Sequence, residues 1–209
     1  MKDPKLFLVS APSGAGKSSL IDAVLASAKQ SDLALELSIS YTTRSPRKGE
    51  SNGNQYFFIS EEDFINKKNS NFFLEHAEVH GNWYGTSVDF VESKLGSGIN
   101  LILEIDVQGF RQINELDIKY ESIFILPPSI YSLEERIKSR GDEDLEAINL
   151  RLKNAKDELA YANEYKHIII NDLFDDAERE LFKIIAQEKL LNREKTEEVQ
   201  QFLAQLLSY

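Results

Sequence analysis

The chain has 209 residues, three histidines and no cysteine, and its formal net charge is -11. This length is enough for one buried core with an inserted lobe. The absence of cysteine excludes disulfides, zinc–thiolate sites and thiol catalysis, and three scattered histidines disfavour a metal cage built by the protein. The negative charge repels nucleic acids and anionic membranes, so an anionic ligand requires a local basic pocket.

No apolar run in the sequence reaches the roughly 18–20 residues that a membrane-spanning helix needs. The first ten residues, MKDPKLFLVS, lack the apolar segment of a signal peptide. We therefore expect a soluble, cytoplasmic protein with neither a nucleic acid nor a membrane as partner. The sequence does not define the oligomeric state, and a homo-oligomer is one alternative.

Apolar runs that are typical of strands alternate with segments of helical spacing along the chain. Residues 5–10 predict a buried strand, and Leu20, Ile21, Val24 and Leu25 place a helix over residues 18–29. Further strands are expected at residues 100–105, 122–126 and 167–170, and further helices at 134–138, 145–161 and 173–191. This alternation predicts an α/β fold, a doubly wound parallel sheet.

Two regions interrupt the alternation. Residues 36–87 are rich in Ser, Thr, Gly, Asn and aromatics, and they predict a small mixed α/β lobe with strands near 56–59 and 72–79. Residues 128–150 are irregular and carry Arg136, Lys138 and Arg140. In the tail, apolar residues share one face of an expected helix. This face packs either on the core of the same chain or on a second subunit. These residues are Val199, Phe202, Leu203, Leu206 and Leu207.

The stretch SAPSGAGKSS, residues 10–19, nearly matches the phosphate-binding pattern G-x-x-x-x-G-K-[ST] between a strand and a helix. Gly14 and Gly16 let successive N–H groups curve around phosphate oxygens, and the helix N-terminus adds positive potential. Lys17 suits the β- and γ-phosphates and the Ser18 hydroxyl suits Mg²⁺. Ala11 replaces the first glycine, which is acceptable where φ is negative. The stretch predicts a nucleoside triphosphate site.

A second basic cluster follows in SISYTTRSPRKGE, residues 38–50, where Arg44, Arg47 and Lys48 lie close together. Because arginine can bind phosphate in a bidentate manner, the cluster is interpreted as a phosphate-binding site. The alternative interpretation is a solvated basic turn without a ligand. Tyr56 and Tyr84 lie in the same lobe. For each of them there are two interpretations: its hydroxyl donates to a phosphate bound by the arginines, or its ring packs in the core.

Glu75 lies in the apolar run of FFLEHAEVHGNWYGTS, where burial of a carboxylate is unfavourable without a partner. A carboxylate facing a ligand suits guanine, because it accepts from N1–H and from the N2 amino group together. Ser40 or Thr86 is then available for guanine O6, and adenine is disfavoured because its N1 lone pair faces the carboxylate. The alternative is a surface carboxylate at a strand edge.

Seven stretches, in this order and spacing, resemble those of guanylate kinases of the bacterial type, which are P-loop nucleoside monophosphate kinases. They are VSAPSGAGKSSL, SYTTRSPRKGE, FLEHAEVHGNWYGTS, LEIDVQG, IFILPPS, RIKSRG and IIINDLFD. The resemblance implies a P-loop core (residues 1–35, 88–127 and 151–209), a GMP-binding lobe (36–87) and a helical lid (128–150). It also implies the reaction ATP + GMP → ADP + GDP with Mg²⁺, and dGMP as a second acceptor.

The resemblance also assigns roles to residues. It implies that the GMP phosphate is held by Arg44, Arg47, Tyr56 and Tyr84, and that the base is read by Ser40, Glu75 and Thr86 with Asp106 beside the nucleotide. ATP is expected at Ser13, Gly14, Ala15, Gly16, Lys17, Ser18, Ser19 and Asn171, with Asn171 near the adenine and Ser18 toward Mg²⁺. The catalytic cations are expected to be Lys17, Arg44, Arg136, Arg140 and Arg151.

Two positions depart from the family pattern. Glu104 takes the place of the first aspartate of the usual LDID, and Ser139 precedes Arg140 where glycine is commoner. Other classes of function remain as alternatives: a non-catalytic scaffold module of the same fold, a kinase for another small acceptor, and a P-loop GTPase. The intact phosphate loop speaks against the scaffold, and the absence of an N-K-x-D motif speaks against the GTPase.

Overall fold

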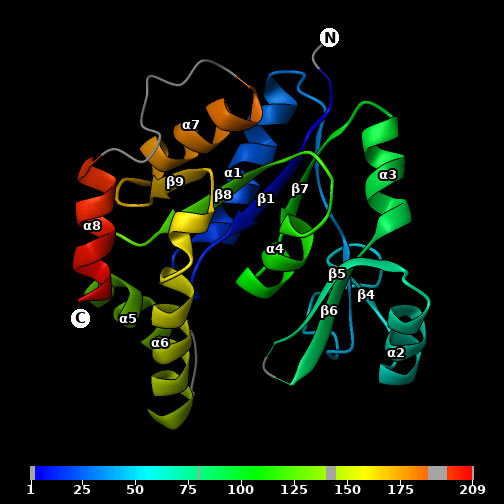
Figure 1. Ribbon diagram of the computed structural model, residues 1–209, viewed down its shortest axis with the longest axis horizontal. Coiled ribbons are helices and arrows are strands. Elements are labelled where there is room, and N and C mark those ends of the chain that lie inside the picture. Colours follow the sequence, from blue (N-terminus) through cyan, green and yellow to red (C-terminus); the bar gives the residue numbers. More distant parts are fainter. Residues whose placement is uncertain (1–2, 80, 140–144, 188–196, 209) are drawn as a thin grey trace. The chain divides into compact units, whose positions relative to one another are not determined.

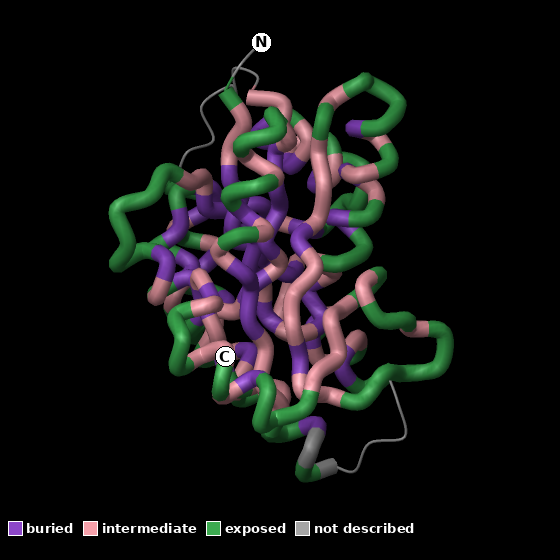
Figure 2. The backbone as a smooth tube through the Cα atoms, turned by 90° about the vertical axis from the view of Figure 1, so that its right-hand side faces the viewer, coloured by how far each residue is buried: buried purple, intermediate pink, exposed green. Residues whose placement is uncertain are grey.

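The computed structural model describes residues 3–79, 81–139, 145–187 and 197–208 (Figure 1). The chain divides into two compact units. The first unit comprises Met1–Leu6 and Ala34–Tyr120, and the second comprises Phe7–Leu33 and Glu121–Tyr209. In the second unit the strands are largely buried, whereas many strand residues of the first unit are half-buried. In both units most exposed residues lie in loops and on outer helix faces (Figure 2).

The second unit contains three parallel strands with helices. Its strands are β1 (Leu6–Ser10), β8 (Tyr120–Leu126) and β9 (His167–Ile170). Its helices are α1 (Lys17–Gln30), α5 (Ile130–Lys138), α6 (Leu145–Leu159), the short 3₁₀ helix η1 (Ala162–Glu164), α7 (Phe174–Ile185) and α8 (Glu197–Leu207). All five residues of β1 are buried, as expected for a strand covered on both faces.

Helix packing completes the second unit. Helix α1 packs against α7, and Ser27 Oγ donates to Glu178 Oε1 at 2.8 Å between them. The tail forms α8, which packs on α6 and buries Val199, Leu203 and Leu206. The tail helix thus packs on another helix of its own chain.

The first unit combines a parallel strand pair with a separate four-stranded sheet. Strands β2 (Leu35–Leu37) and β7 (Asn100–Glu104) pair in parallel, flanked by α3 (Val88–Gly96) and α4 (Val107–Asn114). The other sheet has the order β4-β3-β6-β5, and β5 lies at its edge. These strands are β3 (Ser40–Thr42), β4 (Tyr56–Phe58), β5 (Phe73–Val79) and β6 (Asn82–Ser87), with α2 (Glu61–Asn69) in the same segment.

Aromatic rings form the core of this small sheet. Phe64 of α2 is fully buried and stacks on Phe73 at 4.5 Å and on Trp83 at 5.7 Å between ring centroids. Helix α2 begins after Ser60, whose hydroxyl accepts from Asp63 N. Phe64 is the buried residue of this polar helix, so it carries the attachment of α2 to the sheet.

The sequence predicted the elements of the second unit better than those of the first. The α/β class with a parallel sheet is confirmed, and strand 167–170 and helix 18–29 are found within one residue of their expected ends. The strands β2, β3 and β6 and the helices α2, α3 and α4 were not predicted. The expected helix over 173–191 is described as α7 to Ile185, and residues 188–191 lie outside the described residues.

A first prediction concerns the aromatic core. Phe64→Ala removes a fully buried ring between Phe73 and Trp83 and should lower the free energy of unfolding of the first unit by about 3–5 kcal/mol. Urea titration followed by the fluorescence of Trp83, the chain's single tryptophan, measures this. Leu116→Ala is the control, because Leu116 is 42% exposed in the same unit. Equal midpoints for the two variants would contradict the assigned role of Phe64.

Candidate functional site

The loop between β1 and α1 has the backbone geometry that anion binding requires. Gly14 has φ of 90° and Gly16 has φ of 92°, values that favour glycine strongly. Gly16 is the N-cap of α1, whose first turn contains no acidic residue. Ala11 is not among the non-glycine residues with positive φ, so its predicted tolerance at the strand end is confirmed. The loop therefore leads into an uncompensated positive helix end.

Two side chains hold this loop from outside. Asn171, which follows β9 and is 4% exposed, donates from Nδ2 to the Ala15 carbonyl at 2.7 Å. Arg136, near the end of α5, approaches the same oxygen with Nη1 at 3.5 Å. A Cβ at Gly16 would lie 2.5 Å from Asn171 Nδ2, so glycine is needed here for space as well as for φ. Fixing the Ala15 carbonyl fixes the orientation of the neighbouring N–H groups.

The remaining expected residues of this site lie within the same unit. A cavity of about 280 Å³ is lined by Gly14, Gly16, Ser19, Arg136, Ser139, Asn171, Asp172 and Phe174. Ser13 is half-buried in the loop, Lys17 and Ser18 lie in the first turn of α1, and Arg151 is half-buried in α6. Arg140 lies outside the described residues. Asn171 was expected beside a base, and its contact with the loop carbonyl was not anticipated.

In the first unit, the structure brings Glu75, Thr86 and Ser40 together. Glu75 on β5 is opposite Thr86 on β6, is 5% exposed and accepts hydrogen bonds from Thr86. Ser40 Oγ lies 3.4 Å from Thr86 Oγ1. Burial, reinforced by Asp106, raises the pKa of Glu75 to about 7. The surface alternative for Glu75 is therefore excluded.

The N-terminus of α4 approaches the same carboxyl group closely. Asp106 caps the helix by accepting from Gly109 N at 2.8 Å. A Cβ at Gly109 would lie 2.6 Å from Glu75 Oε2, so only glycine allows this approach. One turn later, Gln112 accepts from His76 N at 3.1 Å and donates to His76 O at 2.6 Å. Gln112 thus fastens the edge strand β5 beside Glu75. Gly109 and Gln112 were not predicted from the sequence.

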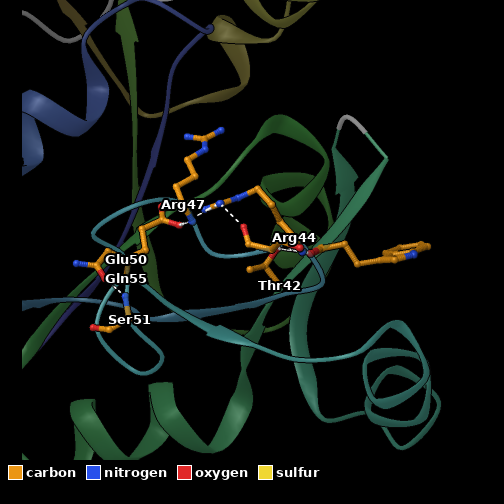
Figure 3. A network of polar contacts seen from close by, with 8 residues as sticks. Thr42, Arg44, Arg47, Glu50, Ser51 and Gln55 are labelled. Carbon is orange, nitrogen blue, oxygen red and sulfur yellow. Dashed lines mark hydrogen bonds and ion pairs between the residues drawn. The ribbon is translucent and has the colours of Figure 1, made fainter.

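The basic turn holds Arg44 in a defined orientation (Figure 3). Arg44 Nη1 and Nη2 donate to the two carboxylate oxygens of Glu50 at 3.0 and 2.9 Å, and Arg47 N donates to Glu50 at 2.7 Å. The guanidinium carbon lies 5.4 Å from the Tyr56 ring centroid. The solvated-turn alternative therefore fails for Arg44. The role of Glu50 in this contact was not predicted from the sequence.

The remaining groups of this cluster surround Arg44. Glu50, and to a smaller extent Tyr84, raise the pKa of Arg44, while the guanidinium holds the pKa of Glu50 below its usual value. The rings of Tyr56 and Tyr84 are 5.8 Å apart, and burial raises the pKa of Tyr56. The Arg47 guanidinium points away from the Glu50 carboxylate (Figure 3). The contacts therefore bring one cation, the Arg44 guanidinium, together with the two phenols.

Among the described residues, no helix is long and apolar enough to cross a bilayer, and no cluster of three His, Asp or Glu side chains could hold a metal ion. A divalent cation at the loop would therefore depend on a hydroxyl oxygen, its own waters and the oxygens of a bound ligand. Ser18, exposed in the first turn of α1, provides the oxygen donor that Mg²⁺ prefers.

Comparisons with known proteins agree on one family. The family model described as guanylate kinase matches residues 3–188. A guanylate kinase of Hahella chejuensis is 48% identical over 186 residues, covering 89% of this chain and 88% of the relative. One of Mannheimia succiniciproducens is 45% identical over the full length of both chains. The crystal structure of guanylate kinase from Anaplasma phagocytophilum has a TM-score of 0.70 and 27% identity, covering 97% of this chain and 95% of that one.

The approach of α4 to Glu75 gives a second prediction. Gly109→Ala places a methyl group against a buried carboxyl and should lower the free energy of unfolding by about 1–3 kcal/mol, despite alanine's better helix propensity. Gly96→Ala is the matched control, because its Cβ would meet nothing within 4 Å, and it should stabilise by at most about 1 kcal/mol. Urea unfolding read through Trp83 compares them, and equal stability would refute the close approach.

Proposed function

This chain belongs to the guanylate kinase family, and from this membership and the two sites we propose that it transfers the γ-phosphoryl group of ATP to GMP. The products are ADP and GDP, and dGMP serves as a second acceptor. The observation that carries the proposal is the buried Glu75 carboxyl beside Thr86 and Ser40. A buried polar set of this kind discriminates strongly between bases, because a wrong base leaves its groups without partners.

The first unit is the acceptor site in this proposal. Ionised Glu75 accepts from guanine N1–H and the N2 amino group, while a hydroxyl of Ser40 or Thr86 donates to O6. Asp106, the cap of α4, lies beside the nucleotide. Arg44 and Arg47 bind the GMP phosphate with the hydroxyls of Tyr56 and Tyr84. The support for this phosphate site is the defined orientation of Arg44 beside two phenols.

The second unit is the donor site. The loop residues from Ser13 to Ser19 hold the ATP phosphates through backbone N–H groups and the Lys17 ammonium. Mg²⁺, when bound to ATP, neutralises charge on the β- and γ-phosphates, and Ser18 is the residue that would hold it. Arg136, Arg140 and Arg151 neutralise the transferring group. Asn171 and the cavity next to the loop accommodate the adenine end of ATP.

The reaction requires positioning and charge neutralisation rather than a general base. A GMP phosphate oxygen forms a bond to the γ-phosphorus, and the bond from that phosphorus to the bridging oxygen of ADP breaks. The attacking oxygen already carries negative charge, so no proton has to be removed from it. The residues of the chain align the two phosphates and supply cations to a loose transition state. Water must be excluded, and we assign this to closure of a lobe (36–87) and a lid (128–150) over the core.

The test of the proposed function is an acceptor panel. AMP, GMP, dGMP, UMP and dTMP are each supplied with Mg-ATP, and ADP release is followed. Turnover is expected with GMP and dGMP and not with the other three. Turnover with AMP in preference to GMP would refute the assignment of Glu75 as the guanine-reading group. Absence of turnover with every acceptor would favour a non-catalytic module.

A further prediction follows from the pKa of Glu75. Because this pKa is raised to about 7, the protonated fraction grows as the pH falls below 7, and the protonated carboxyl cannot accept both guanine donors. Between pH 8 and pH 6 the KM for GMP should therefore rise by about tenfold from this group alone. The KM for ATP should not share this rise, and steady-state kinetics measures both constants.

Glu75→Gln provides the control for that experiment. The amide does not titrate, so the remaining pH dependence of this variant comes from the GMP phosphate and other groups. Its KM for GMP at pH 8 should be higher by about 10²-fold or more, with little change for ATP, because the amide presents a donor to guanine donors. Equal losses for both nucleotides, or an unchanged pH slope in the variant, would contradict the base-reading role.

A further inference from the structure

We propose that Glu50 is a positioning residue that orients the Arg44 guanidinium toward the acceptor phosphate. This inference rests on the proposed function and extends it to a residue that does not itself contact the nucleotide. Its basis is the two-point contact in Figure 3, where both carboxylate oxygens of Glu50 accept from Arg44 at 2.9 and 3.0 Å. Two parallel hydrogen bonds fix the plane of the guanidinium as well as its position.

The contact with Glu50 uses some of the N–H donors of Arg44 and leaves the others for a ligand. A guanidinium has five N–H donors. Glu50 takes one from Nη1 and one from Nη2, and the Ser45 carbonyl takes another from Nη1 at 2.8 Å. One N–H on Nη2 and the N–H on Nε remain, for the Tyr84 hydroxyl and for a phosphate. Glu50 therefore determines which edge of Arg44 can face an anion.

Glu50 is itself fixed by the turn to which it belongs. Its backbone N donates to Arg47 O at 3.0 Å, and its carboxylate accepts from Arg47 N at 2.7 Å. Gly49 between them has φ of 92°, a value that glycine adopts readily. The turn therefore ties Glu50 to Arg47 through both backbone and side chain. One carboxylate consequently links the two arginines assigned to the acceptor phosphate.

The pair is also shielded on the other face of Arg44. The guanidinium carbon lies 5.4 Å from the Tyr56 ring centroid and 5.8 Å from that of Phe58, and the exposed fractions of the Arg44 and Glu50 side chains are 14% and 18%. Limited exposure reduces the screening that makes most surface ion pairs ineffective. Contacts on three sides leave the guanidinium little rotational freedom.

The electrostatic effect of Glu50 on a phosphate has the opposite sign to its positioning effect. A carboxylate near an anionic ligand repels it, so removal of the charge alone would strengthen GMP binding. Loss of orientation would weaken GMP binding instead. The direction of the change in a neutral variant therefore decides between the two roles, and we infer that orientation prevails because three hydrogen bonds converge on Glu50.

The experiment compares Glu50→Gln with Glu36→Gln in the full chain. Glu36 forms an ion pair with Lys94 in the same unit, so both variants lose one carboxylate and one ion pair. Steady-state kinetics gives kcat and the KM values for GMP and ATP, calorimetry gives the Kd for GMP, and Trp83 fluorescence verifies folding. Arg44→Ala and the double variant Arg44→Ala/Glu50→Gln complete a double-mutant cycle.

Glu50→Gln is expected to raise the KM and Kd for GMP by about 10-fold or more, while kcat and the KM for ATP change by less than about threefold. Glu50→Asp, which retains the charge on a shorter stem, is expected to recover part of the loss. In the Arg44→Ala background, Glu50→Gln should change the KM for GMP by less than about twofold, because Glu50 acts through Arg44. Glu36→Gln should behave as the unaltered enzyme.

Three results would overturn the inference. Tighter GMP binding by Glu50→Gln would make Glu50 a competing anion, and a loss no larger than that of Glu36→Gln would make it an ordinary ion pair. A full loss in the Arg44→Ala background would separate Glu50 from Arg44. Failure of the proposed function looks different, because the unaltered chain would then prefer another acceptor, and the same variants would be assayed with that acceptor.

Discussion

A polar or charged group removed from water needs a fixed partner, and this constraint organises both candidate nucleotide sites. The Ala15 carbonyl in the phosphate loop accepts a hydrogen bond from Asn171, and the Glu75 carboxyl accepts from Thr86. The Arg44 guanidinium donates to Glu50. In each case the partner also fixes the direction of the group that it satisfies. Orientation for a ligand is thus a consequence of satisfying polar groups in the ligand-free fold.

The same constraint explains how a chain of net charge -11 can present cations to a phosphate. The Glu50 carboxylate occupies one edge of the Arg44 guanidinium. The cation is therefore fixed in position while other N–H groups stay available for an anion. In the second unit, the glycine loop and the N-terminus of α1 supply positive potential through backbone dipoles rather than through net charge. An acidic protein can therefore bind two anionic nucleotides with a small number of basic side chains.

Local features of the site could be predicted from the sequence, whereas the groups that hold them could not. The loop, Arg44 and Glu75 belong to continuous stretches whose chemistry is visible in the residue types. Asn171 and Ala15 are separated by 156 positions, and Gln112 and His76 by 36, so their contacts depend on tertiary packing. Helix α2 was missed because Phe64 is its buried residue, which leaves no apolar periodicity to detect. Glu50 is close in sequence to Arg44, but a carboxylate after a glycine gives no sign of the contact.

Glu75 illustrates the balance between stability and recognition. Its pKa is raised from 4.5 to about 7, so the folded chain binds this proton more tightly than the unfolded chain between these values. The contribution of Glu75 to the free energy of unfolding therefore falls as the pH rises from about 4.5 to 7, by an amount of about 3 kcal/mol. Above pH 7 the ionised carboxylate has Thr86 as a donor but is still incompletely solvated. In the proposed complex, guanine would supply the missing donors, so the same burial that weakens the ligand-free fold favours a base with two adjacent N–H groups.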